Sequence, residues 1–105
     1  MDYIVVTTTT ENERDAAKIA DALIEQHLAG CVQIVGPIRS VYRWQGEVTS
    51  AEEYRCEVKT RSDQFPAICE IMKKIHPYEV PELIAVPLVD ISPAYRQWLD
   101  EQISS

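Results

Sequence analysis

A chain of 105 residues and 12.0 kDa is long enough for one domain, and residues 1–105 are expected to form a single one. Its 10 basic and 17 acidic residues give a formal net charge of −7, which repels phosphate backbones and argues against nucleic-acid binding. The three cysteines form no Cys-x-x-Cys pair, so the sequence indicates neither a disulfide framework nor a structural zinc site.

The first third of the chain predicts a strand followed by a helix. Residues 3–9 read as a strand with a short apolar run. Thr10 and Glu13 have the spacing of a capping box, with Thr10 as the N-cap. The helix is predicted to run to about Leu28, with Gly30 ending it. Its apolar stripe consists of Ala16, Ala20, Leu23, Ile24 and Leu28.

A long hairpin is predicted next, from strand-like runs at residues 31–44 and 47–60. Gly46 can supply the positive φ that a two-residue turn requires. Fully extended, each run would reach about 46 Å, whereas a domain of this length is about 34 Å across. Two solutions remain open, and both are expected to contribute: a bend or bulge at Gly36-Pro37, and projection of the hairpin to pair with a second copy of the chain.

The last part of the chain predicts a helix, a strand and a shorter helix. The second helix begins at Ser62 and is stopped by Pro77. Residues 83–89 form a fourth strand, and Pro87 indicates an edge position or a bulge. Ser92-Pro93 is a suitable start for a third helix. That helix would carry Tyr95, Trp98 and Leu99 on one face.

This order of elements predicts an α+β fold, the ferredoxin-like βαββαβ sandwich with an extra C-terminal helix. Two helices would cover one face of the antiparallel sheet and leave the other bare. That bare face would carry Arg55, Glu57 and Lys59. A bare face together with an overlong hairpin indicates assembly through the sheets.

The segment from His76 to Glu82 is the strongest candidate site, because two prolines make it rigid. His76, Glu79 and Glu82 could supply ligands to copper or zinc. The alternative is structural, with His76 placed favourably at a helix C-terminus and Pro77 acting as a stop. Lys59 could likewise neutralise an anionic ligand or pair with a neighbouring carboxylate.

Two further expectations come from what the sequence lacks. There is no glycine-rich phosphate loop and no convincing nucleophile–base pair, so the protein is not expected to be an enzyme. There is also no visible signal peptide or membrane-length apolar run, so a cytoplasmic protein without membrane contact is expected.

Five blocks follow one another along the sequence: residues 28–32 (LAGCV), 40–47 (SVYRWQGE), 59–60 (KT), 76–82 (HPYEVPE) and 95–99 (YRQWL). With these blocks in this order, the chain resembles the CutA family of divalent-cation tolerance proteins over nearly its whole length. The resemblance implies a ferredoxin-like subunit in a tight homotrimer similar to PII signalling proteins, with strands that extend between subunits. It also implies cytoplasmic location and a link to copper tolerance and divalent-metal binding.

The family's site residues map onto this chain unevenly. His76 matches the histidine of the His-Pro-Tyr block and is the principal metal-ligand candidate, with Glu79 or Glu82 assisting. Some members have a second histidine where this chain has Ile75, and some have a cysteine where it has Thr8. Other matching residues could line a cleft between subunits: Tyr42, Trp44, Lys59 and Tyr78.

Two functions are therefore predicted from the sequence, and a third possibility, a purely structural or interaction module, stays open beside them. The first is a cytoplasmic, homotrimeric divalent-cation tolerance protein that binds copper or another divalent metal weakly, if at all. The alternative is a PII-like small-molecule sensor with its ligand in the cleft between subunits.

Overall fold

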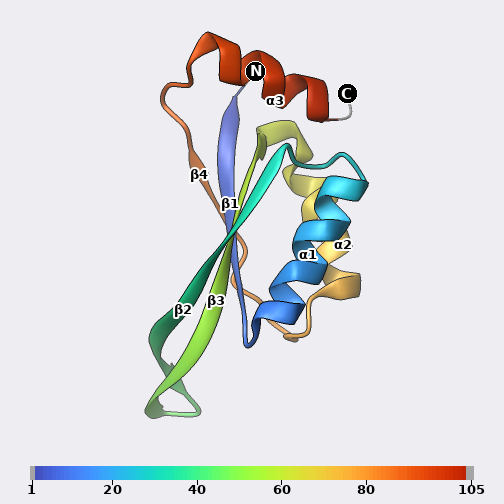
Figure 1. Cartoon of the computed structure of the whole chain (residues 1–105). Coiled ribbons are helices and arrows are strands. Elements are labelled where there is room, and N and C mark those ends of the chain that lie inside the picture. The colour runs from blue at the N-terminus through green and yellow to red at the C-terminus, as the bar shows by residue number, and fades with distance from the viewer. Residues whose placement is uncertain (1, 104–105) are drawn as a thin grey trace.

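The computed structural model describes residues 2–103 and contains the predicted order of elements (Figure 1). These are β1 (Tyr3–Thr10), α1 (Glu13–Glu25), β2 (Cys31–Trp44), β3 (Glu47–Arg61), a short 3₁₀ turn (Ser62–Gln64), α2 (Phe65–Ile75), β4 (Ile84–Pro87) and α3 (Pro93–Gln102). The strands form one antiparallel sheet in the order β2-β3-β1-β4. The predicted ferredoxin-like α+β fold is therefore confirmed.

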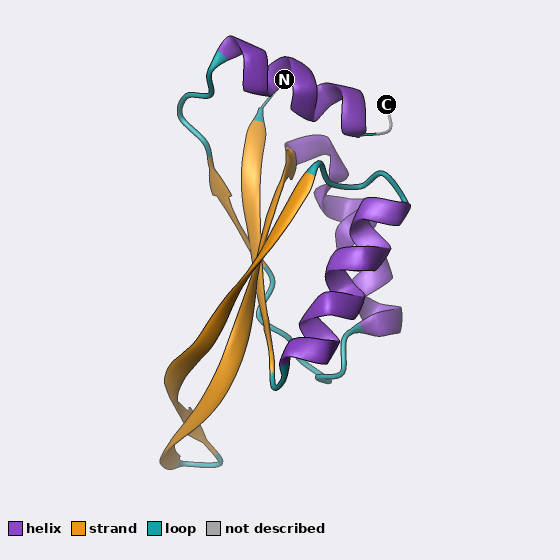
Figure 2. Ribbon diagram, in the orientation of Figure 1, coloured by secondary structure: helices purple, strands orange, loops and turns teal. Residues whose placement is uncertain are grey.

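The main core lies between the sheet and the helices α1 and α2, which cover the same face of the sheet (Figure 2). Alternate residues of the central strands point into it, among them Val6, Cys56 and Val58. The helices contribute Ile19 and Leu23 from α1 and Ile68 and Met72 from α2. Two-residue periodicity on the strands and helical periodicity on α1 and α2 thus meet in one apolar layer.

The ends of α1 differ from the prediction. Asn12, rather than Thr10, caps the helix: its side-chain oxygen accepts a 2.8 Å hydrogen bond from the backbone N–H of Asp15. Thr10 is still the last residue of β1, and its hydroxyl donates to the carbonyl of Asn12 at 2.7 Å. The helix ends at Glu25, before the predicted Leu28, because His27 adopts a left-handed backbone conformation with φ of 58°.

The β2–β3 hairpin projects beyond the ends of both covering helices, as Figure 1 shows. The molecule measures 45 × 27 × 21 Å along its principal axes, so the hairpin sets its longest dimension. The register shifts between Val35 and Ile38, which places the predicted bulge at Gly36-Pro37. The turn has positive φ at Gln45 (51°) and Gly46 (81°), which are the conformations of a type I′ hairpin.

The fourth strand is shorter than predicted, at Ile84–Pro87 instead of residues 83–89, but it lies at the sheet edge as Pro87 indicated. The second helix is preceded by a 3₁₀ turn, so Ser62 begins that turn and α2 itself begins at Phe65. Ser92 caps α3 as predicted, accepting a 3.4 Å hydrogen bond from the backbone N–H of Tyr95.

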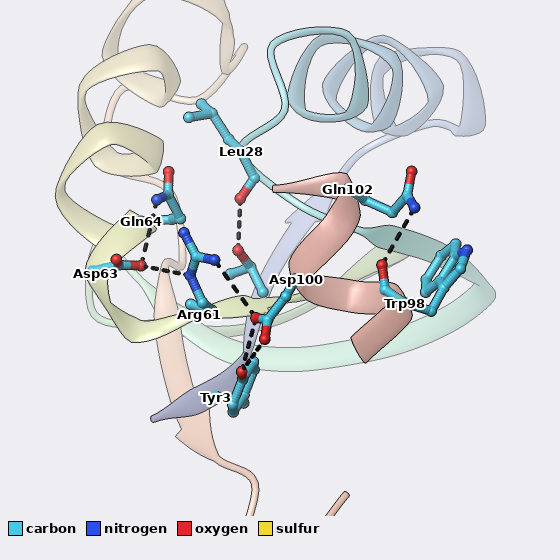
Figure 3. Close-up of polar contacts among 9 residues, drawn as sticks. Tyr3, Leu28, Arg61, Asp63, Gln64, Trp98, Asp100 and Gln102 are labelled. Atoms are coloured by element: carbon cyan, nitrogen blue, oxygen red, sulfur yellow. Dashed lines mark hydrogen bonds and ion pairs between the residues drawn. The ribbon is translucent and has the colours of Figure 1, made fainter. Parts of the chain in front are cut away.

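Hydrogen bonds and an ion pair connect α3 to the start of β1 and the end of β3 (Figure 3). The Tyr3 hydroxyl lies 2.8 Å from both carboxylate oxygens of Asp100, and Arg61 approaches the same carboxylate at 3.5 Å. A small second core of Tyr3, Leu99 and Ile103 lies beside these contacts. The C-terminal helix is therefore a packed part of the fold.

The sheet face opposite α1 and α2 is largely open apart from the end that α3 covers. In the register of the sheet, Arg55, Glu57 and Lys59 lie on this face, as predicted. Glu57 pairs with Arg55 at 3.2 Å, and no ion pair involves Lys59 among the described residues. Ile84 and Val86 of the edge strand are exposed on the same face, which gives it an apolar margin.

Of the three cysteines, Cys56 is the one buried in the core, and burial raises the pKa of its thiol to about 11. Its Sγ donates a 3.6 Å hydrogen bond to the carbonyl of Ala16. A buried thiol that stays protonated behaves as a small apolar residue without reactive character. Cys31 and Cys69 are partly exposed.

Candidate functional site

The His-Pro-Tyr segment leaves the C-terminus of α2 and leads to the edge strand β4. His76 is the C-cap residue of α2, and Pro77 prevents the helix from continuing. The His76 ring is half-buried and points back toward the end of β1. Its Nε2 lies 3.0 Å from the Thr8 hydroxyl and 3.0 Å from the carbonyl oxygen of Thr9.

The hydrogen bonds of His76 define its protonation state. The backbone N–H of Tyr78 donates to Nδ1 at 3.1 Å, so Nδ1 carries a lone pair and the proton resides on Nε2. Nε2 therefore donates to the Thr9 carbonyl. Burial lowers the pKa of His76, partly offset by its bond to Thr9, and the neutral ring is favoured.

Tyr78 connects this loop to the hairpin. Its hydroxyl donates a 2.7 Å hydrogen bond to Oε2 of Glu53 on β3. Burial, followed by the contact with Glu53, raises the pKa of Tyr78 well above its ordinary range, so the phenol stays protonated. Glu53 is only 9% exposed and accepts no other hydrogen bond from the described residues.

A groove of about 880 Å³ lies between the projecting half of the hairpin and the His-Pro-Tyr loop. We call it the hairpin groove. Three aromatic rings line it, those of Tyr42, Trp44 and Tyr78. Three carboxylates also line it, those of Glu53, Glu79 and Glu82.

The structure brings together five of the seven candidate residues. Glu79 and Glu82, predicted as metal ligands, line the same groove as the predicted cleft residues Tyr42, Trp44 and Tyr78. His76 is adjacent through its contact with Tyr78, their ring centroids being 5.1 Å apart, but does not line the groove. Lys59 lies elsewhere, paired in register with Cys31 and Val5 in the middle of the sheet.

Sequence reasoning missed Glu53. Strict alternation with the inward-facing Cys56 and Val58 places residue 53 on the solvent side, where a glutamate attracts no attention. It is buried because Tyr78 packs over it from a loop 25 residues further along the chain. Nothing in the local sequence indicates that contact.

The residues that the structure describes do not assemble a complete metal centre. Among residues 2–103, no three histidine, cysteine or acidic side chains come close enough to hold one ion. The Nδ1 lone pair of His76 is occupied by the Tyr78 amide, and Nε2 carries the proton. Thr8, where some CutA members have cysteine, lies against the ring and offers a hydroxyl in place of a thiolate.

Comparison with known proteins gives the context for this arrangement. The family described as CutA1 divalent ion tolerance protein matches residues 4–102. The chain belongs to the CutA1 family. A divalent-cation tolerance protein CutA from Thermus thermophilus is 45% identical over 97 residues, covering 92% of this chain and 94% of that protein.

Solved CutA1 structures share the whole fold. The Thermus thermophilus protein superposes with a TM-score of 0.93 at 43% identity, covering 97% of this chain and 99% of that one. CutA1 from Oryza sativa superposes with a TM-score of 0.96 at 36% identity, and the match covers 100% of this chain and 96% of that one. The sequence resemblance to CutA is thus confirmed by sequence and by structure.

The relatives differ in length and in location. This chain spans 55% of the mouse CutA protein and 54% of the human one. An Arabidopsis thaliana relative, 40% identical over 91% of this chain and 53% of its own length, is named as chloroplastic. The Archaeoglobus fulgidus structure is described as a periplasmic divalent-cation tolerance protein. In residues 2–103 of this chain, no helix is both long and apolar enough to cross a membrane.

Proposed function

We propose that this protein acts in divalent-cation tolerance as a cytoplasmic, non-enzymatic homotrimer that binds divalent metal ions weakly. The observation that carries the proposal is its match to the CutA1 family over residues 4–102. Relatives that are 45% and 35% identical to this chain bear the divalent-cation tolerance name. The described fold adds a physical reason for assembly and a limit on metal affinity.

Assembly follows from surface that one subunit leaves uncovered. The projecting hairpin exposes Trp44 (63%), Val41 and Val48, and the open sheet face exposes Ile84 and Val86. Apolar side chains gathered on a projecting element and an open sheet face usually mark an interface. A trimer should have a mass of about 36 kDa by light scattering, from closed symmetric assembly. A mass of about 12 kDa in dilute neutral buffer would remove this part of the proposal.

Weak metal binding follows from the state of His76. A metal ion at Nδ1 must displace the hydrogen bond from the Tyr78 amide, which costs about 1–3 kcal/mol if that N–H is left unpaired. Glu79 and Glu82 are carboxylates on the same loop and could assist, with copper and zinc the metals of choice for a histidine nitrogen.

Calorimetric titration of Cu(II) and Zn(II) tests this assignment, using thiol-blocked wild type, His76→Ala and Glu25→Gln. Glu25 is exposed at the end of α1, away from the groove, and serves as the matched surface control. Binding by wild type and the control, but not by His76→Ala, supports His76 as the principal ligand. Identical binding by all three contradicts it.

The hairpin groove favours a second function, a PII-like sensor that binds a small molecule between subunits. Its volume of about 880 Å³ lies within the range of small-molecule sites. Its walls come from the hairpin and the His-Pro-Tyr loop, so a ligand there would contact the element proposed to mediate assembly. Native mass spectrometry of protein purified from its own host tests this function. A small molecule retained by the protein in the spectrum supports this function, and a spectrum of ligand-free protein alone argues against it.

A further inference from the structure

The chemical character of the hairpin groove specifies the kind of ligand it suits. Among the described residues, its lining contains three carboxylates and three aromatic rings and no lysine, arginine or histidine. On the wall that one subunit supplies, an anionic ligand would therefore find repulsion from Glu53, Glu79 and Glu82 without a compensating cation among the described residues. A positively charged ligand would be attracted by the same three carboxylates.

Glu53 provides the fixed point of such a site. The residue is only 9% exposed, and Tyr78 holds Oε2 through its hydroxyl at 2.7 Å. The other carboxylate oxygen, Oε1, has no hydrogen-bond partner among residues 2–103. Every fully enclosed side-chain oxygen in that range does have a partner, so Oε1 is not fully enclosed. It keeps a capacity for hydrogen bonds that the described residues do not use.

The aromatic rings give the second recognition element. Tyr42 and Trp44 come from β2, and Tyr78 comes from the opposite wall. Aromatic faces attract cations and also cover apolar groups, so they suit an ammonium group carried on a hydrocarbon body. A bare metal ion has no apolar body for these rings to cover, and the described part of the chain offers it no set of three ligating side chains.

We infer that the hairpin groove binds an organic cation, a primary or substituted amine with an apolar body, whose ammonium group is held by Glu53 and by the rings of Tyr42 and Trp44. This inference rests on the small-molecule function proposed above and names the ligand class of that same groove. The groove is large enough for an amine of several to a dozen or more heavy atoms.

Three probes of nearly equal size and different charge test the inference: 2-phenylethylamine, 2-phenylethanol and 3-phenylpropionate. Each is titrated into the full assembled protein and followed by calorimetry. The amine should bind about tenfold more tightly than the alcohol, a difference that one exposed cation–π contact and one carboxylate can supply. The anionic probe, 3-phenylpropionate, should bind most weakly of the three.

Two variants locate the site, and one serves as control. Glu53→Gln keeps an acceptor for Tyr78 but removes the charge, and should weaken amine binding about tenfold while leaving the alcohol unchanged. Tyr42→Leu changes an exposed ring and should also weaken the amine, which keeps the test valid if Glu53→Gln fails to fold. Glu25→Gln should bind all three probes as wild type does.

The outcomes separate the inference from the function on which it rests. Equal affinity for the three probes, or unchanged amine binding in both groove variants, overturns the organic-cation inference and leaves a small-molecule role intact. Failure of every probe to bind overturns the organic-cation inference, and is the result expected if a second copy of the chain fills the groove. The small-molecule function is then decided separately by the native mass spectrum of protein from its own host. Binding with the predicted charge order and loss in the variants supports the inference.

Discussion

The hydrogen bond between Tyr78 and Glu53 should stabilise the fold as well as shape the groove, and Tyr78→Phe measures its contribution. The substitution removes one oxygen, which donates at 2.7 Å to a carboxylate that is 9% exposed. Hydrogen bonds to charged groups contribute about 1.5–3 kcal/mol. Because Glu53 would be left buried without its donor, we expect Tyr78→Phe to lower the free energy of unfolding by about 2 kcal/mol.

Urea unfolding followed by far-UV circular dichroism, at one fixed protein concentration, provides the assay. Tyr42→Phe is the matched control, because it removes the same atom from an exposed tyrosine with no hydrogen bond among the described residues, and should change stability by less than about 0.5 kcal/mol. A double-mutant cycle of Tyr78→Phe with Glu53→Ala should show coupling of about 1.5–3 kcal/mol. Additive effects of the two substitutions would refute the claim that the pair acts as one unit.

Three further predictions concern His76, Leu99 and Gly30. Burial lowers the folded-state pKa of His76, so the neutral ring contributes fully to stability above the unfolded pKa of about 6.5. That contribution is lost as the pH falls below this value. The urea midpoints at pH 7.5 and pH 5 should therefore differ less in His76→Gln than in wild type. Leu99→Ala should lower the free energy of unfolding by about 2–5 kcal/mol in the same assay, because Leu99 is fully buried. Gln97→Ala, on the exposed side of α3, should change it little. Gly30→Ala should lower the free energy of unfolding by about 1–3 kcal/mol, because the new Cβ would clash with Cδ1 of Leu99. In the double variant with Leu99→Ala, most of that strain should be absent.

Local patterns predicted the fold well, because its elements are specified by short-range chemistry. Gly46 indicated the hairpin turn, Gly36-Pro37 the bulge, and Pro87 the edge position of β4. The failure at the start of α1 has an equally local cause. Thr10 and Asn12 are both good capping residues, and the sheet decides between them, since Thr10 is still paired with Tyr54 in β1.

The candidate site was harder to predict, because its geometry depends on contacts distant in sequence. Tyr42, Trp44, Tyr78, Glu79 and Glu82 were chosen by motif, and the fold places them around one groove. The buried carboxylate of Glu53 and the inward orientation of His76 result from the loop folding back onto β1 and β3. Neither follows from residue spacing.

The His-Pro-Tyr loop links the two proposed activities through the backbone amide of Tyr78. Any metal ion that takes Nδ1 of His76 must displace this amide, whose residue also holds Glu53 through its hydroxyl. Metal binding at His76 should therefore disturb the wall of the hairpin groove and weaken amine binding, and by thermodynamic reciprocity the amine should weaken metal binding by the same factor. Titrating 2-phenylethylamine with and without saturating Zn(II) measures this coupling, and His76→Ala should abolish it. If wild type binds both and amine affinity is the same with and without metal, the metal does not use Nδ1, and the loop does not connect the two sites.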